Sequence, residues 1–206
     1  MLHGEALLAL ATFTLVASIT PGPNNLMLMS SGANFGFGRS VPHVLGVSIG
    51  VVLMIGVVGT GLHQAFDAFP WTYTALQIIC TGYLIYLAFK IATAAPTASG
   101  VIANKPAKPF TFLQAALFQW VNPKAWAIAL TACASYVPVQ HPLLGLVLVA
   151  GIFGLIGLLS ASMWTLMGGQ MRQVLSNPRR LRAFNILAAT LLLLTLYPVI
   201  AFIGTK

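Results

Sequence analysis

The sequence predicts an all-α integral membrane protein with six transmembrane helices arranged as two inverted three-helix repeats. Of its 206 residues, 58% are hydrophobic and only 6% are charged, whereas a soluble domain carries about 25% charged residues. The apolar residues form continuous runs, each near the ~20 residues that a helix needs to cross a bilayer. Breaks at matching positions of the first and fourth runs predict the repeats. Transmembrane strands would instead alternate in polarity over ~10 residues.

Six apolar runs define the predicted spans. They cover residues 5–32, 41–62, 71–94, 110–137, 143–168 and 182–203. The first run has no basic segment before it and no clear cleavage site, so we expect a helix of the mature protein and no signal peptide. We expect one transmembrane domain over 1–206. Its first repeat covers about 1–94, a cytoplasmic linker about 95–109 and the second repeat about 110–206.

Basic residues concentrate in alternate loops. The loops after the first, third and fifth spans contain Arg39, Lys90, Lys105, Lys108, Arg172, Arg179, Arg180 and Arg182, and the loops after the second and fourth contain none. The positive-inside rule therefore predicts that these three loops are cytoplasmic and that both termini lie outside. We interpret the cluster 172–182 as a topology signal that contacts anionic lipid. We expect no nucleic-acid binding, because no aromatic platform accompanies it.

The first and fourth spans are each interrupted near their middle. The first break reads T-P-G-P-N-N (20–25) and the second W-V-N-P-K-A-W (120–126). Thr20-Pro21 and Asn122-Pro123 are both typical of a helix start, with a capping residue before a proline. We therefore expect two half-helices in each span. Because each half of the chain has three spans, the second half is inverted, which is typical of secondary transporters with broken helices.

Two half-helix N-termini near the middle of the bilayer form an anion site suited to a carboxylate. Lys124 would add a full charge there, or its side chain would extend to the membrane interface. Asn24, Asn25 and Asn122 would hydrogen-bond a substrate or cap the freed backbone. Trp126 lies close enough to the second break to line a pocket and to offer a cation–π contact to a substrate ammonium.

Glycines follow each break. Gly46 and Gly50 predict a close approach of the second span to a neighbouring helix. We expect the same packing role for three glycines of the fifth span, Gly151, Gly154 and Gly157.

Both break motifs point to a known family. T-P-G-P-N-N-L-M-L-M-S-S-G-A-N-F-G-F-G-R-S (20–40) and F-Q-W-V-N-P-K-A-W (118–126) resemble the lysine/homoserine-threonine exporter family (LysE/RhtB) over essentially the whole chain. The stretch 81–92 is similar to the branch that includes cysteine and O-acetylserine exporters. The resemblance implies export of amino acids or related metabolites across the bacterial inner membrane. The family's motif positions present here are Pro21, Gly22, Pro23, Asn24, Asn122, Pro123 and Lys124.

The sequence departs from some relatives at one position that bears on ion coupling. They carry a carboxylate in the second span, where this chain has Val51. A proton-coupled exporter usually needs a titratable group in its path. Besides Lys124, the candidates are Asp67, His63 and His43. Proton coupling is therefore a hypothesis without an assigned residue.

Secondary efflux of small zwitterionic amino acids is the function that we expect, with no enzymatic activity, catalytic residue, cofactor or metal site. Neutral amino acids are favoured because no acid would pair with a second ammonium. The alternatives are an exporter of metal ions or of another small solute and, less favoured, a membrane thiol-redox conduit. The sequence lacks the clustered thiolates or carboxylates that a metal exporter would use, and Cys80 and Cys133 lie away from the breaks. The expected partners are the substrate and the lipid bilayer. Whether the protein forms a homodimer is a question that the sequence leaves open.

Overall fold

The computed structural model describes residues 4–62, 68–93, 108–138, 140–171 and 177–194. Its helices are α1 (Gly4–Ile19), α2 (Pro23–Phe35), α3 (Phe37–Val57), the π-helix η1 (Val58–Leu62), α5 (Pro70–Ala92), α6 (Phe112–Phe118), the 3-10 helix η2 (Gln119–Val121), α7 (Pro123–Tyr136), α8 (Pro142–Gln170) and α9 (Pro178–Leu194). No strand occurs in these ranges. The predicted all-α class is therefore confirmed.

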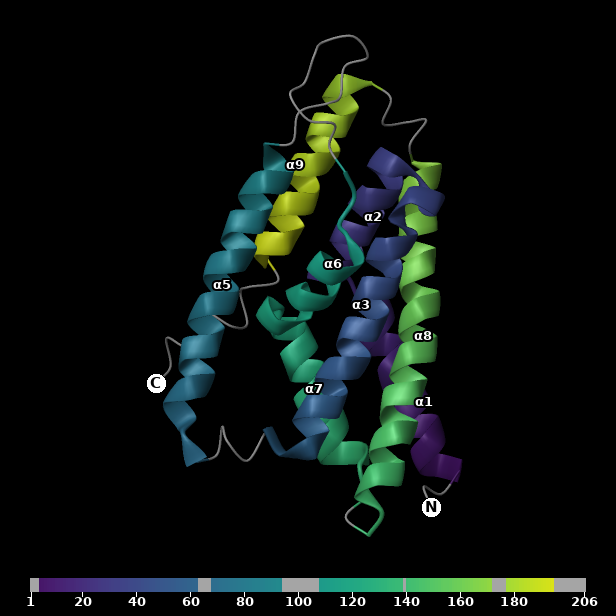
Figure 1. Ribbon diagram of the computed structural model, residues 1–206. Helices are drawn as coiled ribbons and strands as arrows, with labels where there is room; N and C mark the ends of the chain where they lie inside the picture. The colour runs from purple at the N-terminus through teal and green to yellow at the C-terminus, as the bar shows by residue number, and fades with distance from the viewer. Residues whose placement is uncertain (1–3, 63–67, 94–107, 139, 172–176, 195–206) are drawn as a thin grey trace.

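The helices form two groups with a broken segment between them. Figure 1 shows α1, α2, α3 and α8 side by side, and α5 beside α9 on the opposite flank. Between these groups lie α6 and α7. The last turns of α2 and α8 and the first turn of α9 lie at the upper end, whereas the N-terminus and the α7–α8 turn lie at the lower end.

The first predicted break lies between α1 and α2, which meet at a bend of 55°. Pro21 and Pro23 lack the N–H that a continuous helix needs, and Gly22 between them is fully extended. Gly22 is the N-cap of α2 and Pro23 its first residue. The prediction that Thr20 caps this helix is wrong, because the Thr20 hydroxyl donates to the Val16 carbonyl and so belongs to the end of α1.

The second break follows the prediction. α6 starts in a capping box between Thr111 and Gln114 and ends after seven residues in the 3-10 turn η2. Asn122 is then the N-cap of α7, and its side-chain oxygen accepts a hydrogen bond from the Lys124 N–H at 3.1 Å. Pro123 occupies the first helical position, where a missing N–H has no effect.

Glycines set the closest helix contacts. A Cβ at Gly50 would lie 2.8 Å from the Ala116 Cα, and a Cβ at Gly46 would collide with the Phe112 carbonyl oxygen. The predicted close approach is therefore confirmed, and the neighbour is α6. A second close contact joins α2 and α8, where a Cβ at Gly32 would meet the Thr165 carbonyl and one at Gly168 would meet the Met29 carbonyl.

The predicted packing role is wrong for two of the three glycines in α8. A Cβ at Gly151 or at Gly157 would meet no neighbouring atom within 4 Å. Only Gly154 approaches another helix, at 3.0 Å from Val52 of α3. The close backbone contact of α8 with α2 lies further along, at Gly168, because α2 crosses α8 near its C-terminal end.

Two helices of the described chain are long and apolar enough to cross a membrane. They are Phe37–Gly61, with a mean hydropathy of 2.3, and Pro142–Gln170, with 2.6. The bent pair α1–α2 makes a third if it counts as one span. Large apolar side chains are exposed on α8, including Leu143 at 74% and Leu155 at 64%. Such a helix surface suits lipid.

Candidate functional site

The two breaks meet at one cavity, which we call the central cavity. Its volume is about 70 Å³. Most of its polar lining comes from residues in and beside the two breaks, together with Ser48 of α3 and Ser160 of α8. These residues are Ser18, Gly22, Asn24, Asn25, Ser48, Asn122, Lys124 and Ser160. The apolar lining includes Val51, Ile128 and Phe153.

Lys124 connects the two breaks. Its ammonium donates a hydrogen bond to the Thr20 carbonyl oxygen at 2.6 Å. The aliphatic part of its side chain passes over Gly22, where a Cβ would lie 2.8 Å from the lysine Cδ. A residue larger than glycine at position 22 would therefore displace Lys124 from the first break.

The last carbonyl groups of α1 are satisfied by side chains from other segments. Asn25 Nδ2 donates to the Ser18 carbonyl at 2.7 Å and to the Thr20 carbonyl at 2.9 Å. Ser160 of α8 donates to the same Ser18 carbonyl at 2.9 Å. These bonds replace those that the broken helix cannot make, since buried backbone groups need partners. Asn25 thus has the capping role that the sequence suggested as one of two alternatives.

Asn24 pairs with Gln119 across the two breaks. Asn24 Nδ2 donates to Gln119 Oε1 at 2.8 Å, and Gln119 Nε2 donates to Asn24 Oδ1 at 3.1 Å. Gln119 is fully buried and also donates to the Ala115 carbonyl at 2.9 Å. The sequence prediction did not include Gln119. The available signal was an amide within an apolar run beside the W-V-N-P motif.

The cavity carries both signs of polarity. The first turns of α2 and α7 line it and bring partial positive charge, and the Lys124 and Ala125 N–H groups of α7 already donate to Asn122. Lys124 adds a positive charge, whereas the Ser18 and Thr20 carbonyls at the C-terminal end of α1 present negative dipole ends. No carboxylate lies among the described residues around this cavity. The arrangement suits a small ligand with separate negative and positive groups.

Other residues that the sequence singled out lie elsewhere. Pro21 is exposed and Pro23 is buried at the first break. Trp126 packs in the apolar core, and its Nε1 donates to the Trp120 carbonyl at 3.0 Å. It is absent from the residues that line the central cavity. His63 and Asp67 lie outside the described residues.

His43 lies in α3, buried behind α2. Its Nδ1 is 2.8 Å from the Ser31 hydroxyl, and its ring stacks on Phe110 at 5.2 Å. Only 1% of the residue is exposed. Its Nε2 has no hydrogen-bond partner within the described part of the chain.

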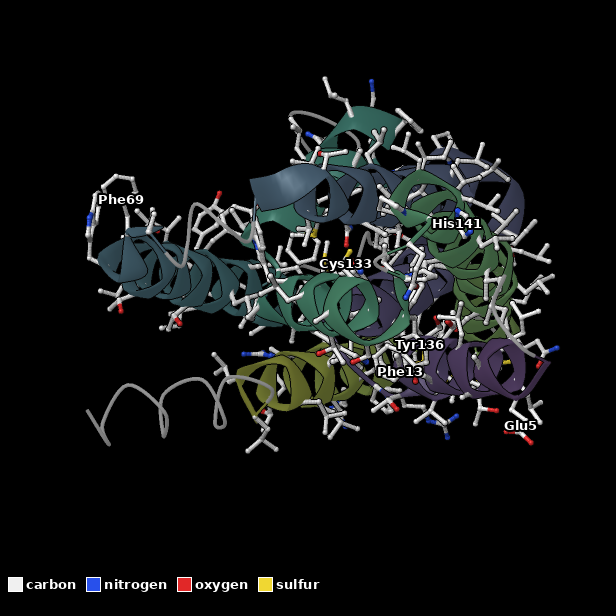
Figure 2. The ribbon with its side chains drawn as sticks, turned by 90° about the horizontal axis from the view of Figure 1, so that it is seen from below. Glu5, Phe13, Phe69, Cys133, Tyr136 and His141 are labelled. Carbon is white, nitrogen blue, oxygen red and sulfur yellow. The ribbon has the colours of Figure 1, made fainter. Side chains whose placement is uncertain are left out.

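An aromatic cluster reaches the central cavity through Phe153. Phe13 stacks on Tyr136 at a centroid distance of 5.6 Å and packs edge-on against Phe153 at 6.1 Å. Figure 2, seen from below, shows Phe13 and Tyr136 close together, while Glu5 and Phe69 lie at the periphery. Phe153 lines the cavity itself.

The comparisons with known proteins identify a family. The sequence model of the LysE type translocator family matches residues 15–197. A cysteine/O-acetylserine efflux protein of Escherichia coli O139:H28 is 31% identical over 184 residues, which are 88% of this chain and 91% of that protein. Proteins with the same description from E. coli K12 and Shigella flexneri are 31% identical over 183 residues, 88% of this chain and 90% of each relative. No solved structure matches the chain significantly. This chain, a multi-pass membrane protein and not an enzyme, belongs to the LysE type translocator family.

Proposed function

We propose that this protein is a secondary transporter that exports small neutral amino acids from the bacterial cytoplasm, and that the central cavity binds them. One observation carries the proposal. The first turns of two half-helices and the Lys124 ammonium converge on the same cavity, beside the carbonyl end of a third half-helix. Broken helices of transporters bind substrate carboxylates and cations with these groups.

Recognition of both charges of the amino acid follows from the Lys124–Thr20 contact. The substrate carboxylate would take the Lys124 ammonium and the N–H groups at the start of α2, next to the positive dipole end of α7. The Thr20 carbonyl, released from Lys124, would then accept a hydrogen bond from the substrate ammonium. The lysine would thus exchange an internal acceptor for the ligand. This exchange explains how the substrate ammonium would be bound although none of the described residues that line the cavity is acidic.

The size of the cavity favours small substrates. One water molecule needs ~10–15 Å³ of such space, so a cavity of about 70 Å³ favours small amino acids over those with large side chains. Several relatives are named cysteine/O-acetylserine efflux proteins. Both of those named amino acids are small and carry one carboxylate and one ammonium. We infer the same substrate class here.

The proposed topology has six spans in two inverted repeats, one over about 1–94 and the other over about 110–206. The repeats form one domain in the bacterial inner membrane. Both termini would face outside, because the basic loops would be cytoplasmic. Support comes from the matching positions of the two half-helices that follow the breaks, α2 beginning at Pro23 and α7 at Pro123. In this orientation the upper end in Figure 1 faces the cytoplasm.

His43 is the coupling residue that we propose among the original candidates. It is a titratable side chain buried between α2 and α3, with one ring nitrogen bonded to Ser31 and the other without a partner among described atoms. Buried histidines within membrane segments are typical of proton relays. Protonation of the His43 ring would place a charge next to α2, which begins at the first break.

Uptake into everted membrane vesicles tests the proposed function, because export then becomes uptake. Labelled cysteine, O-acetylserine, threonine, homoserine, leucine and lysine would be offered with and without an imposed proton gradient. We expect saturable, gradient-dependent uptake of at least one small neutral amino acid and no uptake of lysine. If vesicles with verified folded protein take up none of the six, the proposal is wrong. A metal-ion exporter would then be tested with divalent cations, although the described residues contain no cluster of three His, Cys, Asp or Glu side chains.

A further inference from the structure

A second and larger cavity lies between α2, α5, α6 and α9. We call it the vestibule, and its volume is about 690 Å³. It exists because α6 begins only at Phe112 and is preceded by the extended residues 108–111. This extended segment runs down from the upper end of the molecule, where a full-length helix would otherwise fill the space (Figure 1).

One face of α2 forms a polar wall of the vestibule. Met27, Ser30, Ser31 and Asn34 line it, and their spacing places them on the same side of the helix. Asn34 Nδ2 donates to the Ser30 carbonyl at 2.7 Å and approaches its hydroxyl at 3.3 Å. A wall of hydroxyl and amide groups is costly against lipid but suits water or a polar solute.

Other elements complete a lining suited to an amino acid. Lys108 supplies a positive charge, Gln114 an amide, and Tyr83 and Tyr86 supply aromatic faces with hydroxyl groups. The described lining contains no carboxylate. A ligand with one carboxylate and one ammonium therefore has a partner for its carboxylate, and neutral acceptors and aromatic rings for its ammonium. A ligand with an additional positive charge has no opposite charge to pair with.

The inner end of the vestibule adjoins the central cavity. On the broken segment, Phe118 and Val121 line the vestibule, whereas Asn122 lines the central cavity. On α2, Asn24 lines the central cavity and Met27 the vestibule, one turn further along. The Asn24–Gln119 amide pair thus lies where the two spaces adjoin.

We propose that the vestibule is the cytoplasmic access route and the first binding site for the exported amino acid, and that the Asn24–Gln119 pair closes the passage to the central cavity. The identity of the ligand rests on the proposed function and the cytoplasmic side of the route on the proposed topology, whereas the closure rests on neither. The pair suits this role because its two hydrogen bonds are neutral. Water or a passing ligand can replace them without exposing an unpaired charge.

Side-specific thiol labelling tests this route. In a background with Cys80→Ser and Cys133→Ala, single cysteines replace Ser30 in the vestibule, Ser48 in the central cavity, or Leu155 on the exposed apolar surface of α8 as a control. A membrane-impermeant methanethiosulfonate is applied to everted vesicles and to right-side-out vesicles. Fluorescence-detected size exclusion in detergent verifies that each variant is folded.

We expect Ser30→Cys to react several-fold faster in everted vesicles, and Leu155→Cys to react slowly in both preparations. O-acetylserine should slow the reaction of Ser30→Cys. In everted vesicles Ser48→Cys should react slowly, and several-fold faster once Gln119→Leu removes the amide pair. Asn24→Leu is the second variant for the same test, because it removes the same two bonds from the other side.

The results separate the route from the proposed function, because labelling requires no transport. If Ser30→Cys reacts no faster in everted than in right-side-out vesicles, the route is wrong even where amino-acid uptake is normal. Unchanged labelling of Ser48→Cys in both leucine variants would exclude the pair as the closure. If Ser30→Cys reacts faster in everted vesicles but no amino acid slows the reaction, the vestibule is not the first binding site. If amino-acid uptake is absent as well, the proposed function is also rejected, while the access route stands.

Discussion

The Lys124 ammonium lies 2.6 Å from the Thr20 carbonyl oxygen and joins two helix breaks that are 104 residues apart in the sequence. The donor stands at the start of α7 and the acceptor just beyond the end of α1. A positive group thus meets the negative end of a helix dipole. In the proposed transport cycle, an amino acid replaces this bond with one bond for its carboxylate and one for its ammonium.

Replacing Lys124 with methionine should abolish most transport. A hydrogen bond to a charged group contributes about 1.5–3 kcal/mol, so we expect the initial rate of amino-acid uptake to fall about 10- to 100-fold. Everted vesicles with equal amounts of folded protein provide the measurement. Arg180→Gln is the matched control, since Arg180 is an exposed cation on α9 outside the site. Equal rates for Lys124→Met and the control would remove Lys124 from substrate binding.

Replacing Asn25 with alanine should destabilise the first break. The Thr20 carbonyl would lose one of its partners and the Ser18 carbonyl would keep only Ser160. Lost partners of buried polar groups cost about 1–3 kcal/mol, so the free energy of unfolding in detergent should fall by this amount. Thr60→Ala, at an exposed hydroxyl in η1, serves as the control. An Asn25 variant as stable as the control would show that the break does not depend on this amide.

The close crossing of α2 and α8 should not tolerate a methyl group. In Gly32→Ala the new Cβ would collide with the Thr165 carbonyl, because the helices touch through their backbones. Overpacking costs about 1–3 kcal/mol, which should lower the unfolding temperature. Gly151→Ala is the matched control, because it is the same substitution within a helix but no neighbouring atom lies within 4 Å of the new Cβ. That control should be stabilised by about 0.5–1 kcal/mol. Equal unfolding temperatures for the two variants would contradict the crossing.

Replacing His43 with glutamine should uncouple transport from the proton gradient. Glutamine retains a hydrogen-bonding group for Ser31 but does not titrate. We expect gradient-driven uptake to fall to the level without a gradient, while exchange of labelled for unlabelled amino acid continues. His141→Gln, at an exposed histidine before α8, should leave both activities unchanged. If His43→Gln still responds to the gradient like wild type, coupling lies at another residue.

The sequence predicted the α-helical class and the second break because local chemistry determines both. Continuous apolar runs require helices in lipid, and Asn122-Pro123 is a complete helix start. At the first break, either Pro21 or Pro23 can be the first residue of the second half-helix. The sequence placed the cap at Thr20, whereas the helix begins after the second proline, where Gly22 extends the chain.

Contacts between distant segments could not be predicted from single motifs. Gln119 pairs with Asn24 over a separation of 95 residues, and Ser160 reaches the end of α1 from α8. Glycine spacing identified the contact of Gly46 and Gly50 but not its partner α6. The same spacing argument failed in α8, because the crossing point of a helix depends on its tilt and length, which the three glycines do not encode.

The central claim is that the substrate carboxylate binds at the helix breaks beside Lys124. It is tested most directly by competition between an amino acid and its carboxamide. The measurement is the initial uptake of labelled O-acetylserine into everted vesicles, with increasing unlabelled cysteine or cysteinamide under reducing conditions. We predict that cysteine competes and that cysteinamide, which lacks the carboxylate, does not. Equal competition by both compounds would contradict the account.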